Sequence, residues 1–197
     1  MKYVFLGFIS YLIGNFSGGI IVSKIILGED IRSHGSGNAG ATNALRVFGK
    51  RIGALTFLID FLKGLIMVLI GKYLFGDIGI LISGLAVVIG HDWPAVFSFR
   101  GGKGIATSFG VLVLAAPKFV LAMLVLFTVV VSISKYVSLG SIIMSICAIL
   151  LGVYKIYTEV NTYIGILLIA LGIISIYKHI PNIIRLINGN ENKLVKK

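Results

Sequence analysis

The chain has 197 residues and a net charge of +11, and hydrophobic residues make up 57% of it against 13% that are charged. So few charged residues cannot coat a folded domain of this length, which excludes a soluble globular protein. Apolar runs long enough to cross about 30 Å of hydrocarbon recur along the chain, without the alternation that is typical of a transmembrane β-barrel. We therefore predict an all-α, polytopic integral membrane protein.

These runs predict seven transmembrane helices. They cover residues 3–27, 52–75, 78–90, 105–116, 118–134, 139–157 and 160–177. Pro117 ends the fourth, because proline cannot continue a helix interior. No internal repeat or flexible linker divides the sequence, so we predict a single transmembrane domain over residues 1–197.

Lysines and arginines between the spans predict the orientation. If the N-terminus is outside, most of these residues fall on the cytoplasmic side, as the positive-inside rule requires. We therefore predict an outer N-terminus and a cytoplasmic C-terminus. The basic residues are scattered between spans, which excludes nucleic acid as a partner, and the charge of +11 suits anionic lipid head groups and phosphate-bearing substrates.

The first of three polar stretches is SGNAGATNALR, residues 36–46. Its glycines let the backbone approach a ligand, and Ser36 or Asn38 is predicted to cap a following helix. A helix N-terminus is an anion site, and Thr42 and Arg46 would share one face of that helix. An ordinary loop and helix cap, with Arg46 as a topogenic charge, explains the same pattern equally well.

The second stretch is GHDWPAVFSFRGGKGIATSFG, residues 90–110. Residues 101–104 immediately precede an apolar helix with Thr107 in its first turn. Backbone amides at this helix start, together with Lys103, are predicted to bind a phosphate. This is not a Walker A loop, because Phe97 occupies the position of its first glycine and Gly104 follows Lys103 where Ser or Thr is required. The alternative is a flexible inner turn with one topogenic lysine.

The third stretch is KHIPNIIRLINGNENK, residues 178–193. His179, Asn182 and Arg185 recur every three residues, on one side of a helix that Pro181 would start. Glu191 is available to pair with a loop cation. The alternative is an amphipathic anchor that faces lipid, and we prefer it for the tail lysines Lys193, Lys196 and Lys197.

A few polar residues lie outside these interpretations. Asp60 and Lys63 are three residues apart inside the second span, where unpaired charges are costly, so we predict that they pair with each other. His91 and Trp93 are interpreted as residues of the membrane interface. Ser138 either faces the polar site or caps the sixth span.

The three stretches, in this order on the predicted topology, resemble the three motifs of the bacterial acyl-phosphate:glycerol-3-phosphate acyltransferase family. The resemblance implies transfer of a fatty acyl group from acyl phosphate to the sn-1 hydroxyl of glycerol 3-phosphate, giving lysophosphatidate and phosphate in the first acylation of phospholipid synthesis. It further implies a multi-pass protein of the bacterial cytoplasmic (inner) membrane, and a soluble enzyme that makes acyl phosphate as a candidate partner.

The resemblance also implies the site residues. Those implied to be catalytic are Ser36, Arg46, Lys103, His179 and Asn182. Those implied to bind substrate are Gly37, Asn38, Gly40, Thr42, Asn43, Gly101, Gly102, Gly104, Thr107, Ser138, Arg185 and Glu191. No cofactor is expected, and no metal site is predicted, because the sequence contains no cluster with metal-ligand spacing.

Two alternatives stay open at this point. No histidine is followed five residues later by aspartate, as acyl-CoA-type acyltransferases require, so the proton acceptor is either His179 or a phosphate of the substrate itself. The competing class is a membrane transporter of a phosphorylated solute. Polar stretches that gather at the inner face, and not at mid-membrane depth, favour the enzyme.

Overall fold

The structure, a computed structural model, describes residues 1–194, so Lys196 and Lys197 of the predicted anchor lie outside the described residues. All regular elements of this described part are helices, which confirms the all-α prediction. The helices form two compact units, Met1–Ala115 and Ala116–Lys197.

Several helices are long and apolar enough to cross a membrane. They are Lys2–Leu27, Ala41–Phe97, Pro117–Ser134 and Val137–Tyr157, to which the pair Thr162–Lys178 and Ile180–Ile187, bent by 55°, can be added. Their outward faces are apolar; on Pro117–Ser134, for example, the side chains of Leu121 and Ile133 are 68% and 80% exposed. Such faces suit a hydrocarbon surrounding and not water.

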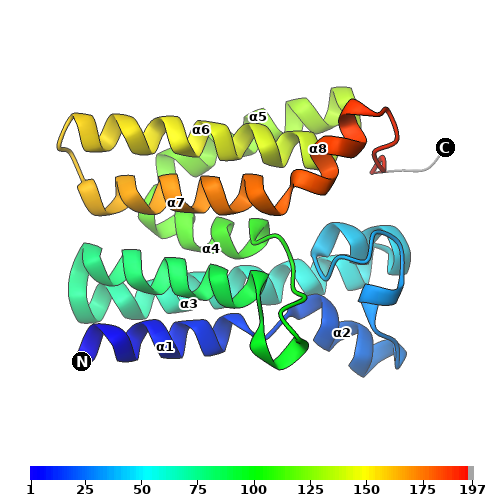
Figure 1. Ribbon diagram of the computed structural model, residues 1–197, viewed down its shortest axis with the longest axis horizontal. Coiled ribbons are helices and arrows are strands. Elements are labelled where there is room, and N and C mark those ends of the chain that lie inside the picture. The colour runs from blue at the N-terminus through cyan, green and yellow to red at the C-terminus, as the bar shows by residue number, and fades with distance from the viewer. Residues whose placement is uncertain (195–197) are drawn as a thin grey trace. The chain divides into compact units, whose positions relative to one another are not determined.

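The first predicted span is broken. Helix α1 (Lys2–Gly14) and helix α2 (Gly18–Leu27) run along α3 and are separated by residues 15–17 (Figure 1). The predicted span over 3–27 matches the candidate span Lys2–Leu27, but its helix is interrupted. Asn15 and the pair Gly18–Gly19 are poor helix formers, and the backbone groups that the break releases find partners elsewhere in the unit.

The second and third predicted spans belong to α3 (Ala41–Asp92), whose helical backbone is interrupted at Gly49 and again at Phe75 and Gly76. The second interruption falls between the two predicted spans, as expected. The two arms then approach closely, because a Cβ atom on Gly71 or on Gly79 would collide with the carbonyl oxygen of the other. The helix that residues 41–46 were predicted to form is the first segment of α3.

Short elements complete the first unit. The 3-10 turns are η1 (Ile31–Ser33) and η2 (Ala95–Phe97), and α4 (Ile105–Ala115) follows the Gly-Gly-Lys-Gly segment. Helix α4 packs tightly on α3, since a Cβ on Gly64 would collide with the carbonyl of Thr107 and one on Gly110 with the carbonyl of Phe61. This contact places the start of α4 beside the middle of α3.

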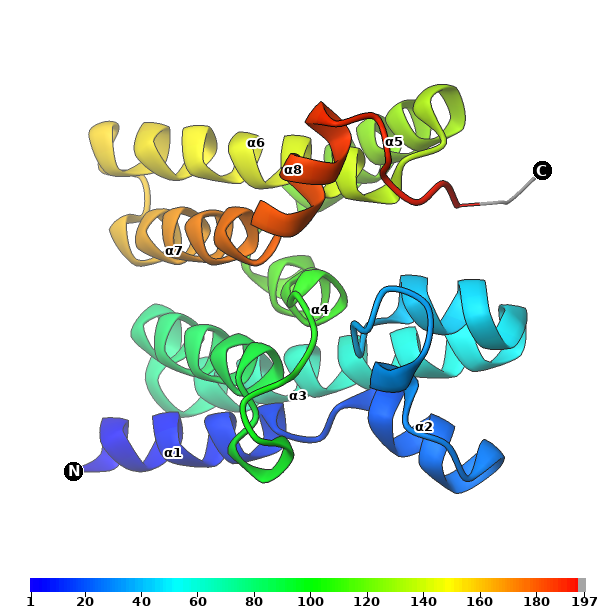
Figure 2. The same cartoon turned by 45° about the vertical axis from the view of Figure 1, so that its right-hand side comes forward.

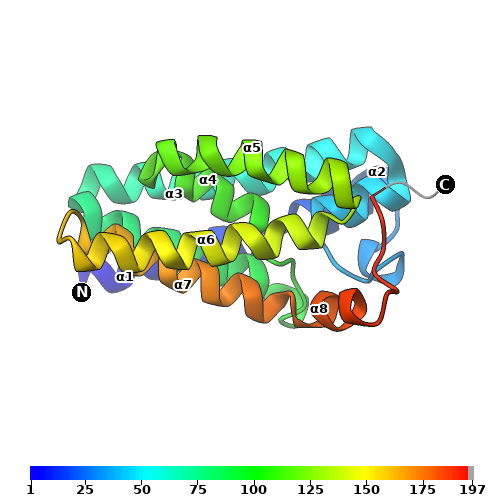
Figure 3. The same ribbon diagram turned by 90° about the horizontal axis from the view of Figure 1, so that it is seen from above.

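The second unit contains α5 (Pro117–Ser134), α6 (Val137–Tyr157), α7 (Thr162–Lys178) and α8 (Ile180–Ile187). Pro117 begins α5, which confirms that it ends the preceding helix. Figure 2 shows α6 and α7 side by side, and Ser145 Oγ donates to Ser175 Oγ across this pair at 2.7 Å. Helix α8 turns away from α7 at His179 (Figure 3).

Candidate functional site

The residues implied by the sequence divide between the two units. Unit Met1–Ala115 holds Ser36, Gly37, Asn38, Gly40, Thr42, Asn43, Arg46, Gly101, Gly102, Lys103, Gly104 and Thr107. Unit Ala116–Lys197 holds Ser138, His179, Asn182, Arg185 and Glu191. Each group is described within its own unit.

Asn43 shapes the loop of the first stretch. Its Oδ1 accepts a hydrogen bond from the Ser36 amide at 2.9 Å, and its Nδ2 donates to the carbonyls of His34 and Asn38, each at 3.0 Å. The Asn43 side chain is buried while Ser36 is exposed. One buried amide therefore holds the loop in a fixed curve that presents Ser36 outward.

The predicted cap of the following helix was wrong. The N-cap is Gly40, which has no side chain to cap with, and Asn38 Oδ1 instead accepts from the Gly40 amide at 3.0 Å. Asn38 thus closes a turn before the helix begins, because its short side chain reaches an amide two residues on. Without a side-chain cap, the first amides of α3 point out of the helix end, where an anion would bind, and Thr42 and Arg46 lie one turn apart on that helix.

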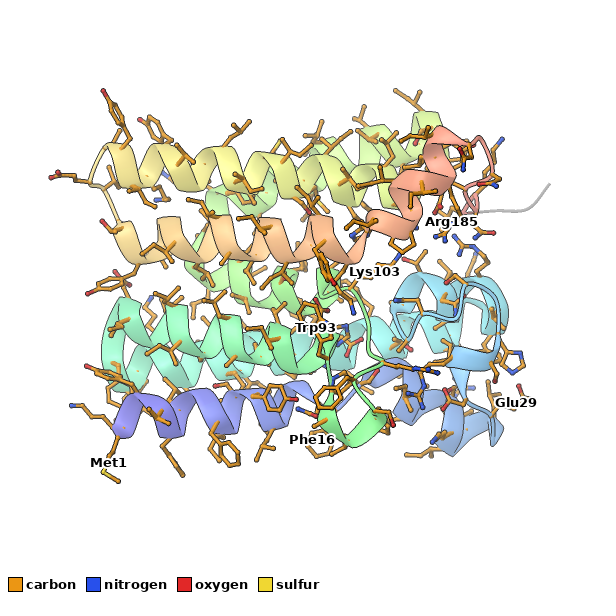
Figure 4. All side chains as sticks on the ribbon, in the orientation of Figure 1. Met1, Phe16, Glu29, Trp93, Lys103 and Arg185 are labelled. Atoms are coloured by element: carbon orange, nitrogen blue, oxygen red, sulfur yellow. The ribbon has the colours of Figure 1, made fainter. Side chains whose placement is uncertain are left out.

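The second stretch ends in a loop that lies against His91. The Gly102 amide donates to the His91 carbonyl at 3.1 Å, and a Cβ at Gly102 would collide with His91 Nε2. Gly104 has a φ of +70°, which side-chain-bearing residues rarely adopt, and α4 starts at the next residue. Trp93 and Lys103 both lie on the segment between α3 and α4 (Figure 4).

Thr107, in the first turn of α4, is fully buried. Its Oγ1 has no hydrogen-bond partner among the described residues. A buried hydroxyl without a partner is unusual in a folded protein. At this point α4 packs against Gly64 of α3, so the hydroxyl is enclosed by protein.

Arg32 joins the first stretch to the second. Its Nη1 donates to the Phe97 carbonyl at 2.9 Å, while its Nε and Nη2 bind the Asp30 carboxylate at 3.0 and 2.8 Å. The hydrogen bond from Arg32 lowers the pKa of Asp30 to about 2, so this ion pair persists at every physiological pH. Arg32 thus ties the segment before the first glycine-rich stretch to the 3-10 turn before the second. The sequence analysis missed Asp30 and Arg32, for which an Asp-x-Arg triplet before the first stretch was the available signal.

A buried ion pair lies beside the break in the first span. Lys63 Nζ is 2.9 Å from Asp60 Oδ1, which confirms the predicted pairing. His91 Nδ1 lies 2.8 Å from the same ammonium, and His91 is only 2% exposed. His91 is therefore part of a buried polar network with Asp60 and Lys63.

In the second unit, His179 and Asn182 come from the junction of α7 and α8. His179 Nδ1 lies 2.8 Å from the Ser175 carbonyl, which can only accept, so Nδ1 carries a proton and Nε2 is the nitrogen that can exchange one. Pro181 lies in the first turn of α8, as predicted, and Asn182 faces inward while Ile184 and Ile187 are exposed. The apolar side of this helix thus points outward.

Glu191 gathers the remaining polar side chains of this unit. Its carboxylate accepts from Ser138 Oγ at 2.9 Å, from Asn182 Nδ2 at 2.8 Å and from Arg185 Nε at 2.8 Å. Burial acts to raise the pKa of this carboxyl, but the three hydrogen bonds outweigh it, so the pKa lies below the ordinary value of a glutamate. Glu191 therefore stays charged and orients Asn182 and Arg185. Its cation, Arg185, belongs to helix α8, whereas the prediction was a loop cation.

The chemistry that these groups offer is binding of anions. The first unit combines two helix starts that follow glycine-rich segments with the side chains of Arg46 and Lys103. Within residues 1–194, no group of three or more His, Cys, Asp or Glu side chains could hold a metal ion.

Comparison with known proteins gives a consistent family. The family profile described as glycerol-3-phosphate acyltransferase matches residues 4–189. A glycerol-3-phosphate acyltransferase of Finegoldia magna is 54% identical, with 98% of this chain and 96% of that protein covered. One of Bacillus subtilis is 39% identical, with 94% of each chain covered.

Two solved structures are similar to the chain. Both are crystal structures of PlsY, an integral membrane glycerol 3-phosphate acyltransferase. Its glycerol 3-phosphate form is 37% identical with a TM-score of 0.89, covering 98% of this chain and 96% of that one. Its lysophosphatidic acid form is 35% identical with a TM-score of 0.86, covering 98% and 95%.

Proposed function

The chain belongs to the glycerol-3-phosphate acyltransferase family, and from this premise we propose that it transfers a fatty acyl group from acyl phosphate to the sn-1 hydroxyl of glycerol 3-phosphate. The products are lysophosphatidate and inorganic phosphate. The observation that carries the proposal is that one unit holds two glycine-rich helix starts, with Arg46 and Lys103 near them in the sequence, and that the Arg32–Phe97 hydrogen bond joins the segments that precede them. A transporter of phosphorylated solutes is not favoured, since the similar proteins are named as acyltransferases.

The reaction brings two phosphate-bearing molecules together, so their mutual repulsion must be offset. The carbonyl oxyanion and the departing phosphate also need stabilisation as the ester forms. Backbone amides at helix starts supply fixed dipoles, and a site screened less than bulk water strengthens them. Arg46 suits phosphate through its planar fork of donors, whereas Lys103 acts as a point charge.

Roles follow for the individual residues. The catalytic side chains are Ser36, Arg46, Lys103, His179 and Asn182. The two loops bind the phosphates, and their residues are Gly37, Asn38, Gly40, Thr42, Asn43, Gly101, Gly102, Gly104 and Thr107. Within them, the Asn43 side chain and the amides of Gly40 and Gly102 hold the loops in shape through hydrogen bonds to protein atoms. In the second unit, the residues proposed to bind substrate are Ser138, Arg185 and Glu191. The contacts of Asn43 and Glu191 support an orienting role for both.

His179 is able to accept a proton at Nε2, because Nδ1 already donates to the Ser175 carbonyl. A phosphate of the substrate can accept the same proton. The tautomer of His179 supports the first route, while the good leaving-group character of phosphate lowers the demand for a protein base.

An apolar groove in the first unit could hold the acyl chain of the substrate. A groove of about 630 Å³ runs between α1 and α3. Its lining includes Leu6, Ile13 and Met67, with Lys63 at one end and Lys2 at the other. Apart from the two lysines, its lining side chains are apolar, so an acyl chain can remain in contact with hydrocarbon while the head group reacts.

We also propose that residues 1–197 act as one transmembrane domain with seven spans, an outer N-terminus and a cytoplasmic C-terminus, in the bacterial cytoplasmic membrane. The family match across both units supports a single domain. Acyl phosphate then arrives from the cytoplasm, which makes a soluble acyl-phosphate-producing enzyme a candidate partner. Cysteine labelling at Asn43, Gly102 and Asn182 tests this orientation, because all three positions must react from the cytoplasmic side.

An assay of the purified protein with rival acyl donors tests which donor it uses. Labelled glycerol 3-phosphate is offered with acyl phosphate, acyl-CoA or acyl carrier protein as rival donors. We expect lysophosphatidate only with acyl phosphate, with one phosphate released for each ester formed. Transfer from acyl-CoA or acyl carrier protein at a comparable rate would contradict the proposal.

A further inference from the structure

We propose that the buried network Asp60–Lys63–His91 is a positioning device for the Gly101–Gly104 loop, and that it couples this loop to the break in the first span. This inference rests on the proposed role of the loop in binding a phosphate-bearing substrate. It assigns a function to charged residues that no substrate needs to touch.

On one side, the ion pair binds the ends of the broken span. Lys63 Nζ donates to the carbonyls of Gly14 at 2.9 Å and Phe16 at 2.7 Å, while Asp60 Oδ1 accepts from the Gly18 amide at 3.0 Å. Phe16, labelled in Figure 4, lies at this break. Carbonyls at the end of α1 and an amide at the start of α2 are therefore bound by one pair of side chains from α3.

On the other side, the ammonium of Lys63 reaches His91. The distance from Nζ to Nδ1 is 2.8 Å, and Asp60 Oδ1 is 3.3 Å from the same nitrogen. Lys63 Nζ thus has three oxygen acceptors and the Nδ1 atom of His91 within 2.9 Å, so each of its three protons has a partner. The imidazole of His91 is held in one orientation as a result.

The far edge of that ring is the surface on which the loop rests. Gly102 lies so close that a Cβ there would collide with Nε2, and the Gly102 amide binds the His91 carbonyl at 3.1 Å. A Cβ at Gly101 would collide with the same carbonyl. The position of Lys103, between Gly102 and Gly104, is therefore fixed by a ring that the ion pair orients.

The break brings further contacts to the same segment. Tyr11 Oη donates to the Trp93 carbonyl at 2.9 Å, and the Val96 amide donates to Asn15 Oδ1 at 3.4 Å. Two residues that follow His91 in the chain are thus bound to the end of α1. An uninterrupted apolar helix would need no buried charges, and charges inside spans are costly and usually functional. The network is explained if placement of the loop requires it.

A double-mutant cycle tests this inference. Gly102→Ala is measured in the natural chain and in His91→Asn, whose Oδ1 replaces Nδ1 as the acceptor for Lys63 while the space occupied by the ring edge is vacated. We expect Gly102→Ala alone to raise the KM of one phosphate-bearing substrate at least tenfold, with kcat changed less than threefold. In the His91→Asn background the same substitution should raise that KM less than threefold, because the collision is gone.

Further variants separate placement of the loop from stability. His91→Leu keeps bulk but offers no acceptor to Lys63, so its KM for the same substrate should exceed that of His91→Asn at least threefold. Ser83→Ala is the matched control, since Ser83 is buried on the same helix and bonds only to the Gly79 carbonyl. Its KM should stay within twofold of the natural value.

The outcomes are decisive in both directions. Equal effects of Gly102→Ala in the two backgrounds, or none in the natural chain, would overturn the inference. If His91→Asn and a second variant, His91→Ser, both fail to fold, His91 serves the fold and not the loop, and the inference again falls. Failure of the proposed function looks different: the natural chain would then make no lysophosphatidate from acyl phosphate at all.

Discussion

Lys103→Ala is expected to lower kcat/KM by at least about 100-fold in protein that is folded and inserted, and Arg46→Ala should do the same. Each change removes a positive charge from the proposed site, in which two phosphate groups must be held together. The loss exceeds that of a surface charge, because the site is screened less than bulk water. Initial rates with purified variants and saturating acyl phosphate measure it.

Two comparisons make this result specific to the site. Lys50→Ala removes an exposed charge shortly after Arg46 on the same helix, and its activity should stay within twofold of the natural chain. Lys103→Arg keeps the charge but changes its shape, so it should recover part of the lost activity. Near-natural turnover in Lys103→Ala or Arg46→Ala would remove that residue from the mechanism.

Much of the fold could be predicted, because membrane spans can be recognised in a sequence as long apolar runs. The turn in α3 could be predicted at Gly76, which lies between two apolar runs and has a φ of +62°. The break at residues 15–17 could not be predicted in the same way, because the apolar run continues across it. Its released backbone groups bind Asp60 and Lys63, which lie more than 40 positions later in the sequence.

The site shows the same division between local and distant information. Glycines, a lysine and a helix start are adjacent in the sequence at residues 101–105, so the glycine-rich loop and the helix that follows it could be predicted. The burial of His91 could not, because it depends on Lys63 from the middle of α3 and on the loop that covers the ring. Arg32 was missed for the same reason, since its contact with Phe97 joins positions 65 residues apart.

The buried ion pair leads to the second large effect. Lys63→Met should lower the free energy of unfolding by about 3–5 kcal/mol, because it leaves the Asp60 charge buried without its partner. It also removes the donor from the carbonyls of Gly14 and Phe16. Denaturant unfolding of the purified protein in detergent measures the loss, together with the yield of inserted protein.

Lys72→Met is the matched control, because it makes the same substitution at an exposed position of the same helix and should change stability by less than about 0.5 kcal/mol. The double variant Asp60→Asn/Lys63→Met removes the unpaired charge and should recover part of the loss. It cannot recover all of it, since each carbonyl left without a donor costs about 1–3 kcal/mol. A double variant as stable as the natural chain would mean that the break in the first span holds without the ion pair, and that the charges serve neither helix end.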